Sequence, residues 1–222
     1  MGETMADFAA EREAMIERQL KRRGITDQRI LDAFMAVPRD EFVDPDRAHL
    51  AYGDHPLPIE AGQTISQPYI VALMVQAARI GPGDTVLEVG AGSGYAAAVI
   101  SRMAERVIAI ERQHELVLIA RERLRRLGYD NVQIIEGDGT RGWTAEAPYD
   151  AILAAASGSH VPETLIAQLA PGGRLVMPIG DPSLVQELVK VTKQDGGILK
   201  QDNLGGVRFV PLIGEEGWEE GR

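Results

Sequence analysis

The segment that most constrains the fold is VLEVGAGSGY at residues 86–95, an apolar strand that runs directly into a glycine-rich turn. Gly90, Gly92 and Gly94 permit positive φ angles and a close approach of the backbone to a ligand. The helix expected after the turn points its first amides at the same place. Together these features predict a nucleotide-type cofactor site in an α/β sheet. The alternative is a strand-turn-helix corner that uses glycine only for tight packing.

The spacing of the glycines distinguishes between cofactors. A dinucleotide fingerprint has the pattern G-x-G-x-x-G, and Tyr95 stands where its third glycine would fall. Glu88, inside the strand, would repel a pyrophosphate but suits the α-amino group and sulfonium of S-adenosyl-L-methionine. We therefore expect this cofactor to contact Glu88, Gly90, Ala91, Gly92, Ser93 and Gly94.

Two further acids follow the next two predicted strands. The first strand ends in Glu111, a little under the roughly 20 residues past the glycines where a ribose-binding carboxylate is expected. Glu111 has an equal alternative as a cap of the helix that begins near residue 113. The second strand leads to Asp138 and Gly139 in a glycine-flanked loop. Because ligands bind at the carboxyl ends of strands in open α/β sheets, we assign Glu88, Glu111 and Asp138 to the methionine, ribose and adenine regions of one site.

Composition limits the class of protein. The chain has 222 residues, of which 45% are hydrophobic and 25% charged, which suits one globular domain. The absence of cysteine excludes disulfides, zinc–thiolate sites and thiol catalysis. A net charge of −10 argues against a nucleic-acid surface, and the basic cluster at residues 121–126 is expected on the solvated face of a helix. No leader or long apolar run is visible, so we expect a cytoplasmic protein without membrane or metal partners.

The order of elements predicts an α/β fold with a doubly wound, mainly parallel Rossmann-like sheet, N-terminal helices and antiparallel C-terminal strands. We expect a single domain over residues 1–222. It comprises N-terminal helices and a loop (1–80), a cofactor-binding core (81–180), antiparallel strands (181–214) and a frayed tail (215–222). Helices are expected at 8–23, 27–37, 69–79, 94–104, 113–127 and 161–169; strands at 84–89, 107–111, 132–135, 149–155, 173–178, 186–193, 198–202 and 207–212; and a loop without structure of its own at 38–68.

Several motifs outside the glycine turn are characteristic of one family. The chain resembles protein-L-isoaspartate O-methyltransferases along nearly its whole length. The glycine motif is shared by many methyltransferases, whereas GQTISQP and VRFVPL are highly specific. The matching runs are VPRDEFV at 37–43, AYGD at 51–54, LPI at 57–59, GQTISQPY at 62–69, VLEVGAGSGY at 86–95, PGGRL at 171–175 and VRFVPL at 207–212.

The resemblance implies methylation of the abnormal carboxylate of isoaspartyl residues in damaged proteins, which starts their repair, with S-adenosyl-L-homocysteine as the product of the cofactor. It places the active-site serine at Ser66 and the cofactor contacts on the residues already assigned. Substrate contacts are expected at Thr64, Gln67, Tyr69, Val207, Arg208, Phe209 and Val210. Ser66 has an alternative role as the N-cap of a helix with Pro68 in its first turn.

One stretch departs from the family. Residues 154–160 read AAASGSH in place of a Thr-Ala-Ala-Pro-Pro-like run, which puts the shape of this loop and any substrate contact there in question. We expect His160 to be an exposed loop or helix-capping residue rather than a catalytic base. Two other functions remain open. One is a carboxyl methyltransferase that acts on ordinary aspartate or a small carboxylate, and the other is a non-catalytic nucleotide-binding module.

Overall fold

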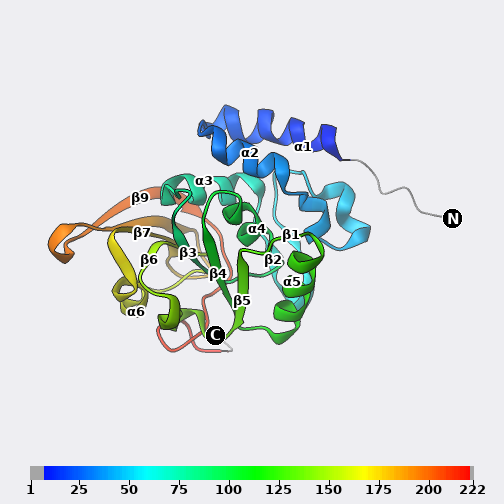
Figure 1. Cartoon of the computed structure of the whole chain (residues 1–222). Coiled ribbons are helices and arrows are strands. Elements are labelled where there is room, and N and C mark those ends of the chain that lie inside the picture. The colour runs from blue at the N-terminus through cyan, green and yellow to red at the C-terminus, as the bar shows by residue number, and fades with distance from the viewer. Residues whose placement is uncertain (1–7, 221–222) are drawn as a thin grey trace.

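The structure is a computed structural model that describes residues 8–220. Its centre is a seven-stranded sheet in the order β5-β4-β3-β6-β7-β8-β9 (Figure 1). The first five of these strands are parallel, whereas β8 and β9 pair antiparallel. The predicted fold class is therefore confirmed. The strands are β3 (Thr85–Val89), β4 (Arg106–Glu111), β5 (Val132–Glu136), β6 (Tyr149–Ala154), β7 (Leu169–Ile179), β8 (Gln186–Lys193) and β9 (Leu199–Val207).

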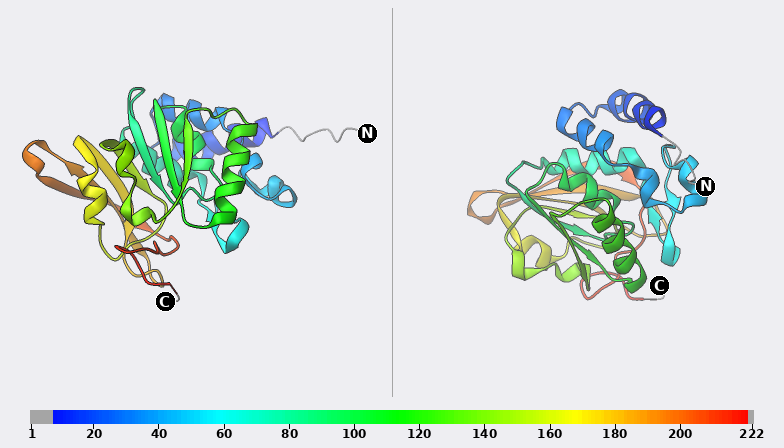
Figure 2. Two further views of the ribbon diagram at one scale, coloured as in Figure 1. Left: turned by 60° about the horizontal axis from the view of Figure 1, so that its bottom comes forward. Right: turned by 45° about the vertical axis from the view of Figure 1, so that its right-hand side comes forward.

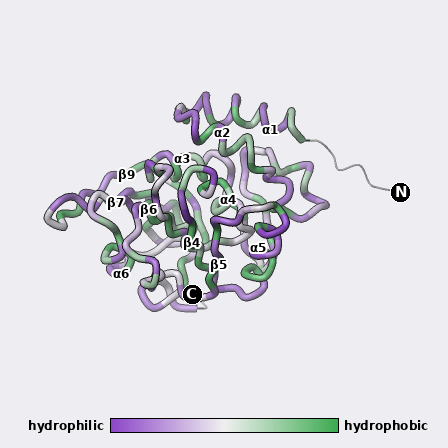
Figure 3. The backbone as a smooth tube through the Cα atoms, viewed as in Figure 1, coloured by the Kyte–Doolittle hydropathy of each residue, from purple (hydrophilic) through white to green (hydrophobic). Residues whose placement is uncertain are grey.

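Helices cover both faces of the sheet (Figure 2). One face packs against α3 (Pro68–Ala78), α4 (Tyr95–Ser101) and α5 (His114–Arg126), and the other against α6 (Glu163–Ala167). Strands β3, β4 and β6 are buried almost throughout, as expected of parallel strands covered on both sides. Figure 3 shows the same division, with apolar colour on the central strands and polar colour along the outer helices.

The N-terminal segment contains two helical stretches that lie over α3 (Figure 1). The first is α1 (Ala9–Met15), which continues as a π-helical turn and a 3-10 turn until Gly24, whose φ of 89° ends it next to the expected end at residue 23. The second is α2 (Gln28–Ala36), which begins close to the expected start at residue 27, where the Asp27 side chain accepts from the Arg29 amide and caps the helix. The expected structureless loop at 38–68 is wrong. It holds three 3-10 turns and the antiparallel pair β1 (Leu57–Pro58) and β2 (Thr64–Ile65).

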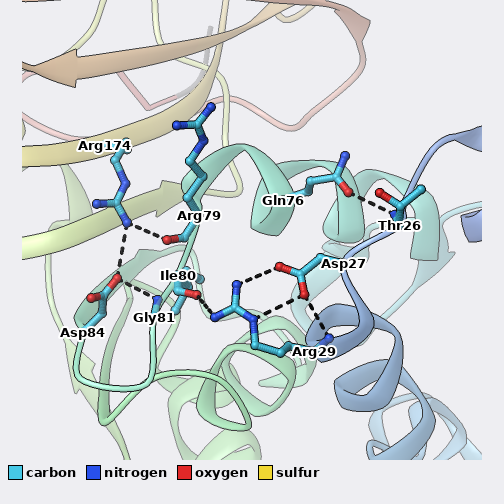
Figure 4. Close-up of polar contacts among 9 residues, drawn as sticks. All are labelled: Thr26, Asp27, Arg29, Gln76, Arg79, Ile80, Gly81, Asp84 and Arg174. Carbon is cyan, nitrogen blue, oxygen red and sulfur yellow. Dashed lines mark hydrogen bonds and ion pairs between the residues drawn. The ribbon is translucent and has the colours of Figure 1, made fainter.

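Two arginines from distant elements cap the C-terminal end of α3. Arg174, on β7, donates from Nε to the carbonyl of Ala78 at 2.7 Å. It also donates from Nη2 to the carbonyl of Arg79 at 2.8 Å (Figure 4). Arg29, on α2, donates to the carbonyl of Ile80 at 3.0 Å. These bonds satisfy carbonyls that a helix end leaves unpaired. They hold α3 against the sheet, and the N-terminal end of the same helix borders the site described next.

Arg121, Arg125 and Arg126 of the basic cluster are exposed on α5, as predicted, whereas Arg123 is largely buried. Two of its arginines pair with the N-terminal segment: Arg123 contacts Glu60 and Arg126 contacts Glu41, each at 2.8 Å. Arg121 donates to the carbonyl of Ile134. The cluster therefore joins α5 to its neighbours within the same chain.

Candidate functional site

The glycine turn after β3 adopts the predicted conformation. Gly90, Gly92 and Gly94 have φ angles of 88°, 53° and 87°, a region that other residues rarely occupy. The amides of Gly90 and Ala91 both donate to the carbonyl of Ile110, at 2.8 and 3.0 Å, so the end of β4 holds the turn. These two bonds fix the backbone of the turn relative to β4.

A cavity of about 390 Å³ opens beside this turn. It lies between the ends of β3 and β6, where the strand order reverses, which is where open α/β sheets bind their ligands. Its size falls in the range of cofactor and substrate pockets. The walls come from the segment before α3 and the first turns of that helix, from the glycine turn, from the ends of β4 and β6, and from residues 209–213.

Glu88 presents an unsatisfied acid to this cavity. The residue is 1% exposed, and its Oε2 atom has no hydrogen-bond partner within residues 8–220. Burial, together with the charge of Glu111, raises the pKa of Glu88 well above its ordinary value. A buried carboxylate without a partner is unfavourable unless a proton or a cation neutralises it. The cavity therefore favours a ligand that brings positive charge to Glu88.

Glu111 lines the same cavity and is held by two backbone amides. Its Oε2 atom accepts from Gly92 at 3.0 Å and its Oε1 atom from Gln113 at 2.9 Å. Gln113 is the N-cap residue of α5, so Glu111 does support the start of this helix. Each carboxylate oxygen has a second lone pair, which is available to a ribose hydroxyl. The two roles considered for Glu111 are thus compatible.

The loop after β5 brings Gly139, but not Asp138, into the cavity wall. Asp138 accepts at Oδ1 from the amide and hydroxyl of Thr140 and at Oδ2 from the amide of Glu215. Burial tends to raise the pKa of Asp138, but these hydrogen bonds outweigh it and leave the pKa below the ordinary value. A Cβ atom on Gly139 would lie 2.5 Å from Val89 Cγ1, so only glycine fits there. Asp138 acts on the site by shaping this loop.

Ser66 lies between β2 and α3 and borders the cavity. Its hydroxyl makes no hydrogen bond to any other described residue. The alternative in which Ser66 caps α3 is wrong, because the N-cap is Gln67 and no side chain caps this helix. Pro68 does occupy the first turn, as expected. The side chain of Ser66 therefore has no structural partner that would explain its presence.

The other residues expected from the same motif divide into two groups. Thr64 lines the cavity with Ser66. Gln67 and Tyr69 do not line the cavity. The Gln67 amide donates to Asp54 at 3.0 Å, and the Tyr69 ring lies 3.4 Å from the Arg23 guanidinium carbon.

The predicted strand at 207–212 is wrong. β9 ends at Val207, which pairs with Gln186. Because Gln186 is the first residue of β8, residues after Val207 have no residue of β8 to pair with. Arg208 is exposed, whereas Phe209 and Val210 line the cavity. We call residues 208–212 the acceptor segment. It is held by the Gln186 side chain, which accepts from the Phe209 amide at 2.9 Å, and by Ser157, whose amide donates to the Val210 carbonyl at 2.8 Å.

Sequence reasoning missed the contacts that the C-terminal residues make beside the site. The tail was expected to be frayed over 215–222. Residues 221–222 lie outside the described residues, but residues 216–218 are partly buried and the segment 215–220 bonds to the rest of the protein. Trp218 donates from Nε1 to the Ser157 carbonyl at 2.8 Å, and Glu220 pairs at 2.8 Å with Arg112, a residue of the cavity wall. A tryptophan in a polar tail was the available signal, since such a side chain is usually buried when its N–H finds an acceptor.

The atypical loop at 154–160 contributes only its first residues to the site. Ala155 and Ala156 line the cavity, and their small side chains leave it open. His160 is exposed, as predicted, and its Nδ1 atom lies 2.9 Å from Ser159 Oγ.

Within residues 8–220, no group of three His, Asp or Glu side chains is arranged to hold a metal ion. In the same residues, no helix is long and apolar enough to cross a membrane.

Comparisons with known proteins agree on one family. A family model described as protein-L-isoaspartate(D-aspartate) O-methyltransferase matches residues 10–217. Protein-L-isoaspartate O-methyltransferase 2 of Pelobacter propionicus is 54% identical over 93% of this chain and 92% of its own length. A Rhodopseudomonas palustris relative named protein-L-isoaspartate O-methyltransferase is 53% identical over 93% of this chain and 94% of its own.

Two solved structures extend the likeness. One, named protein-L-isoaspartate O-methyltransferase, superimposes with a TM-score of 0.85 at 34% identity and covers 93% of this chain and 67% of its own. The other, from Plasmodium falciparum, was determined in complex with S-adenosyl-L-homocysteine. It has a TM-score of 0.79 at 30% identity and covers 94% of this chain and 99% of its own.

Proposed function

Because this chain belongs to the protein-L-isoaspartate O-methyltransferase family, we propose that its cavity holds the cofactor along the glycine turn and the acceptor carboxylate beside Ser66. The chain is a methyltransferase. It transfers a methyl group from S-adenosyl-L-methionine to the free carboxylate of L-isoaspartyl residues in damaged proteins and peptides, which initiates their repair.

The observation that carries the site assignment is the position of Ser66. Its unpartnered hydroxyl borders the same cavity as Glu88 and Glu111. An acid with one unpaired oxygen, a second acid held by amides, and a serine with an unpaired hydroxyl thus meet in one space. Each of them has capacity for a ligand group that the protein does not satisfy.

The residues present fit the cofactor. Glu88 would accept from its α-amino group, and Glu111 would accept from the ribose hydroxyls with its remaining lone pairs. Gly90 to Gly94 would let its chain approach the backbone, and Gly139 would border its adenine end, with Asp138 holding that loop. When bound, the cofactor supplies an electrophilic methyl group.

The acceptor requires positioning more than activation. A carboxylic acid has a pKa of about 4, so the nucleophile is already ionised at neutral pH and no general base is needed. Ser66 would donate its hydroxyl to one carboxylate oxygen and so orient the other, with Thr64 beside it. Orientation of this kind supplies several kcal/mol of rate acceleration.

The backbone of the substrate would pair with the acceptor segment. Ser157 engages the Val210 carbonyl, but the Val210 amide has no partner among the described residues. An extended peptide can bond such a group by strand addition, which reads main chain more than side chains. Peptides N-methylated next to the isoaspartate should therefore be poor substrates, whereas varied side chains should be tolerated. Equal rates for the N-methylated and unmodified peptides would contradict this pairing.

The cofactor assignment is tested by calorimetric titration of S-adenosyl-L-methionine and of NAD. We expect the first to bind and the second not to bind. Glu111→Ala should weaken S-adenosyl-L-methionine binding by about 1.5–3 kcal/mol, the value of a charged hydrogen bond. Preferential binding of NAD would favour the alternative of a non-catalytic nucleotide-binding module. Unchanged affinity in Glu111→Ala would confine Glu111 to supporting α5.

We further propose that the chain acts on damaged proteins and peptides in the cytoplasm, without nucleic-acid, membrane or metal partners. The cysteine-free sequence suits a reducing compartment, and the net charge of −10 disfavours polyanions.

A further inference from the structure

Two adjacent large apolar side chains are exposed on the turn between β7 and β8. Leu184 is 62% exposed and Val185 is 59% exposed. Because β7 runs parallel to β6, its last residue, Ile179, lies at the same edge of the sheet as the cavity. The turn that follows Ile179 therefore stands on the functional edge of the molecule.

The same turn is joined to the acceptor segment. The buried side chain of Gln186 donates to the Asp181 carbonyl at 3.2 Å and accepts from the Phe209 amide at 2.9 Å. Val185 lies against Gly206, where an added Cβ atom would come within 2.9 Å of Val185 Cγ1. The turn and the strand end thus form one continuous surface that leads into the cavity at Phe209.

Glycine keeps this surface open. An added Cβ atom on Gly205 would meet nothing within 4 Å, so the space above this residue is not filled by protein. Gly206 and Phe209 are three residues apart, about 10 Å along an extended chain. If a substrate chain ran from the cavity along this direction, a residue two or three positions from the isoaspartate would reach Leu184 and Val185.

We propose that Leu184 and Val185 form an apolar ridge that binds an apolar side chain of the substrate two or three positions from the isoaspartate. This inference rests on the proposed function. Binding buries apolar surface of Leu184 and Val185 against the substrate side chain. The ridge therefore favours substrates with leucine-like flanking residues over those with polar ones. Main-chain pairing along the acceptor segment sets the register, and the ridge adds selectivity among damaged sites.

The test uses isoaspartyl peptides that differ only in flanking residues. One peptide has serine at the second and third positions on both sides, and two others have leucine at these positions on one side only. We expect wild-type kcat/KM to be about three- to tenfold higher for one of the leucine peptides, as partial burial of such side chains implies. The double variant Leu184→Ser, Val185→Ser should lose this preference.

A matched control exists at the other end of the β8–β9 hairpin. Ile198 and Leu199 are 64% and 45% exposed, and they lie at the tip that points away from the cavity (Figure 1). The double variant Ile198→Ser, Leu199→Ser should keep the wild-type preference. The KM for S-adenosyl-L-methionine should be the same in all three proteins.

The proposed role of the ridge would be overturned by equal kcat/KM for serine and leucine peptides in the wild type. It would also be overturned if both double variants lost the preference for the leucine peptide equally. A changed sedimentation coefficient of the Leu184→Ser, Val185→Ser protein with unchanged peptide preference would assign these residues to contact with a second copy and would also overturn it. Absence of turnover on every isoaspartyl peptide would instead contradict the proposed function, and the ridge with it.

Discussion

Ser66 makes no hydrogen bond to the described part of the chain, which leaves its hydroxyl for an acceptor. If it orients the carboxylate, Ser66→Ala should lower kcat about tenfold to a hundredfold, the equivalent of 1.5–3 kcal/mol for a hydrogen bond to a charged group. The melting temperature should not change, because no cap is lost. Steady-state kinetics and a melting curve on the same preparation measure both quantities.

Ser66→Thr is the control, since it keeps the hydroxyl. It should retain more activity than Ser66→Ala, and the affinity for S-adenosyl-L-methionine should be similar in both variants and the wild type. A wild-type kcat in Ser66→Ala would remove Ser66 from the mechanism.

Glu88 makes the stability of the cofactor-free protein depend on pH. Its folded pKa is raised well above the ordinary value of 4.5 by burial and by Glu111. The folded state therefore holds this proton more tightly than the unfolded state, and stability falls as pH rises from 4.5 through the raised pKa. Glu88→Gln stays neutral, so its melting temperature should exceed that of the wild type by an amount that grows with pH over this window.

The same substitution should weaken S-adenosyl-L-methionine binding, because the amide cannot pair with the α-amino group as a carboxylate does. Melting curves across the pH window and one titration at neutral pH check both expectations. A melting difference that does not depend on pH would show that folding leaves the pKa of Glu88 unchanged, which would contradict the effect of its burial.

At the scale of elements, two buried glutamines each bridge a backbone amide and a backbone carbonyl of separate segments. Gln186 bridges Asp181 and Phe209 on the acceptor side, and Gln168 accepts from the Trp143 amide and donates to the Arg141 carbonyl, each at 2.8 Å. Each substitution by leucine should cost about 1–3 kcal/mol of stability, because backbone groups lose their partners.

Of these two variants, only Gln186→Leu should raise the KM for isoaspartyl peptides, since Gln186 contacts the acceptor segment and Gln168 does not. Its affinity for S-adenosyl-L-methionine should remain that of the wild type. Equal peptide KM values for Gln186→Leu and Gln168→Leu would show that the acceptor segment is positioned by other contacts.

How far the sequence predicts an element depends on where its partners lie. The glycine turn was predictable because positive φ angles are a local property of glycine, and the start of α2 was predictable because the Asp27 cap bonds a residue two positions away. The end of β9 was not predictable from its own sequence, because it is set by the residue at which the partner strand β8 begins. The packed tail was not predictable either: Glu215 bonds to Asp138 across 77 positions, and Trp218 to Ser157 across 61. Such contacts leave little trace in a local pattern.

At the scale of the whole molecule, the sheet brings together residues from three distant parts of the chain. Ser66 precedes the sheet, Glu88 and Glu111 belong to its centre, and Phe209 follows its last strand. The cofactor residues alone would serve many methyltransferases, and the segments on either side select the acceptor. We therefore expect this cavity to methylate isoaspartate and to discriminate against ordinary aspartate.

The most direct test is a paired assay with two peptides of identical sequence, one with L-isoaspartate and the other with L-aspartate. Each is incubated with the enzyme and methyl-labelled S-adenosyl-L-methionine, and ester formation is followed by mass spectrometry. We predict methyl ester on the isoaspartyl peptide and none above background on its aspartyl isomer. Equal methylation of the two isomers, or methylation of the aspartyl peptide alone, would contradict the account.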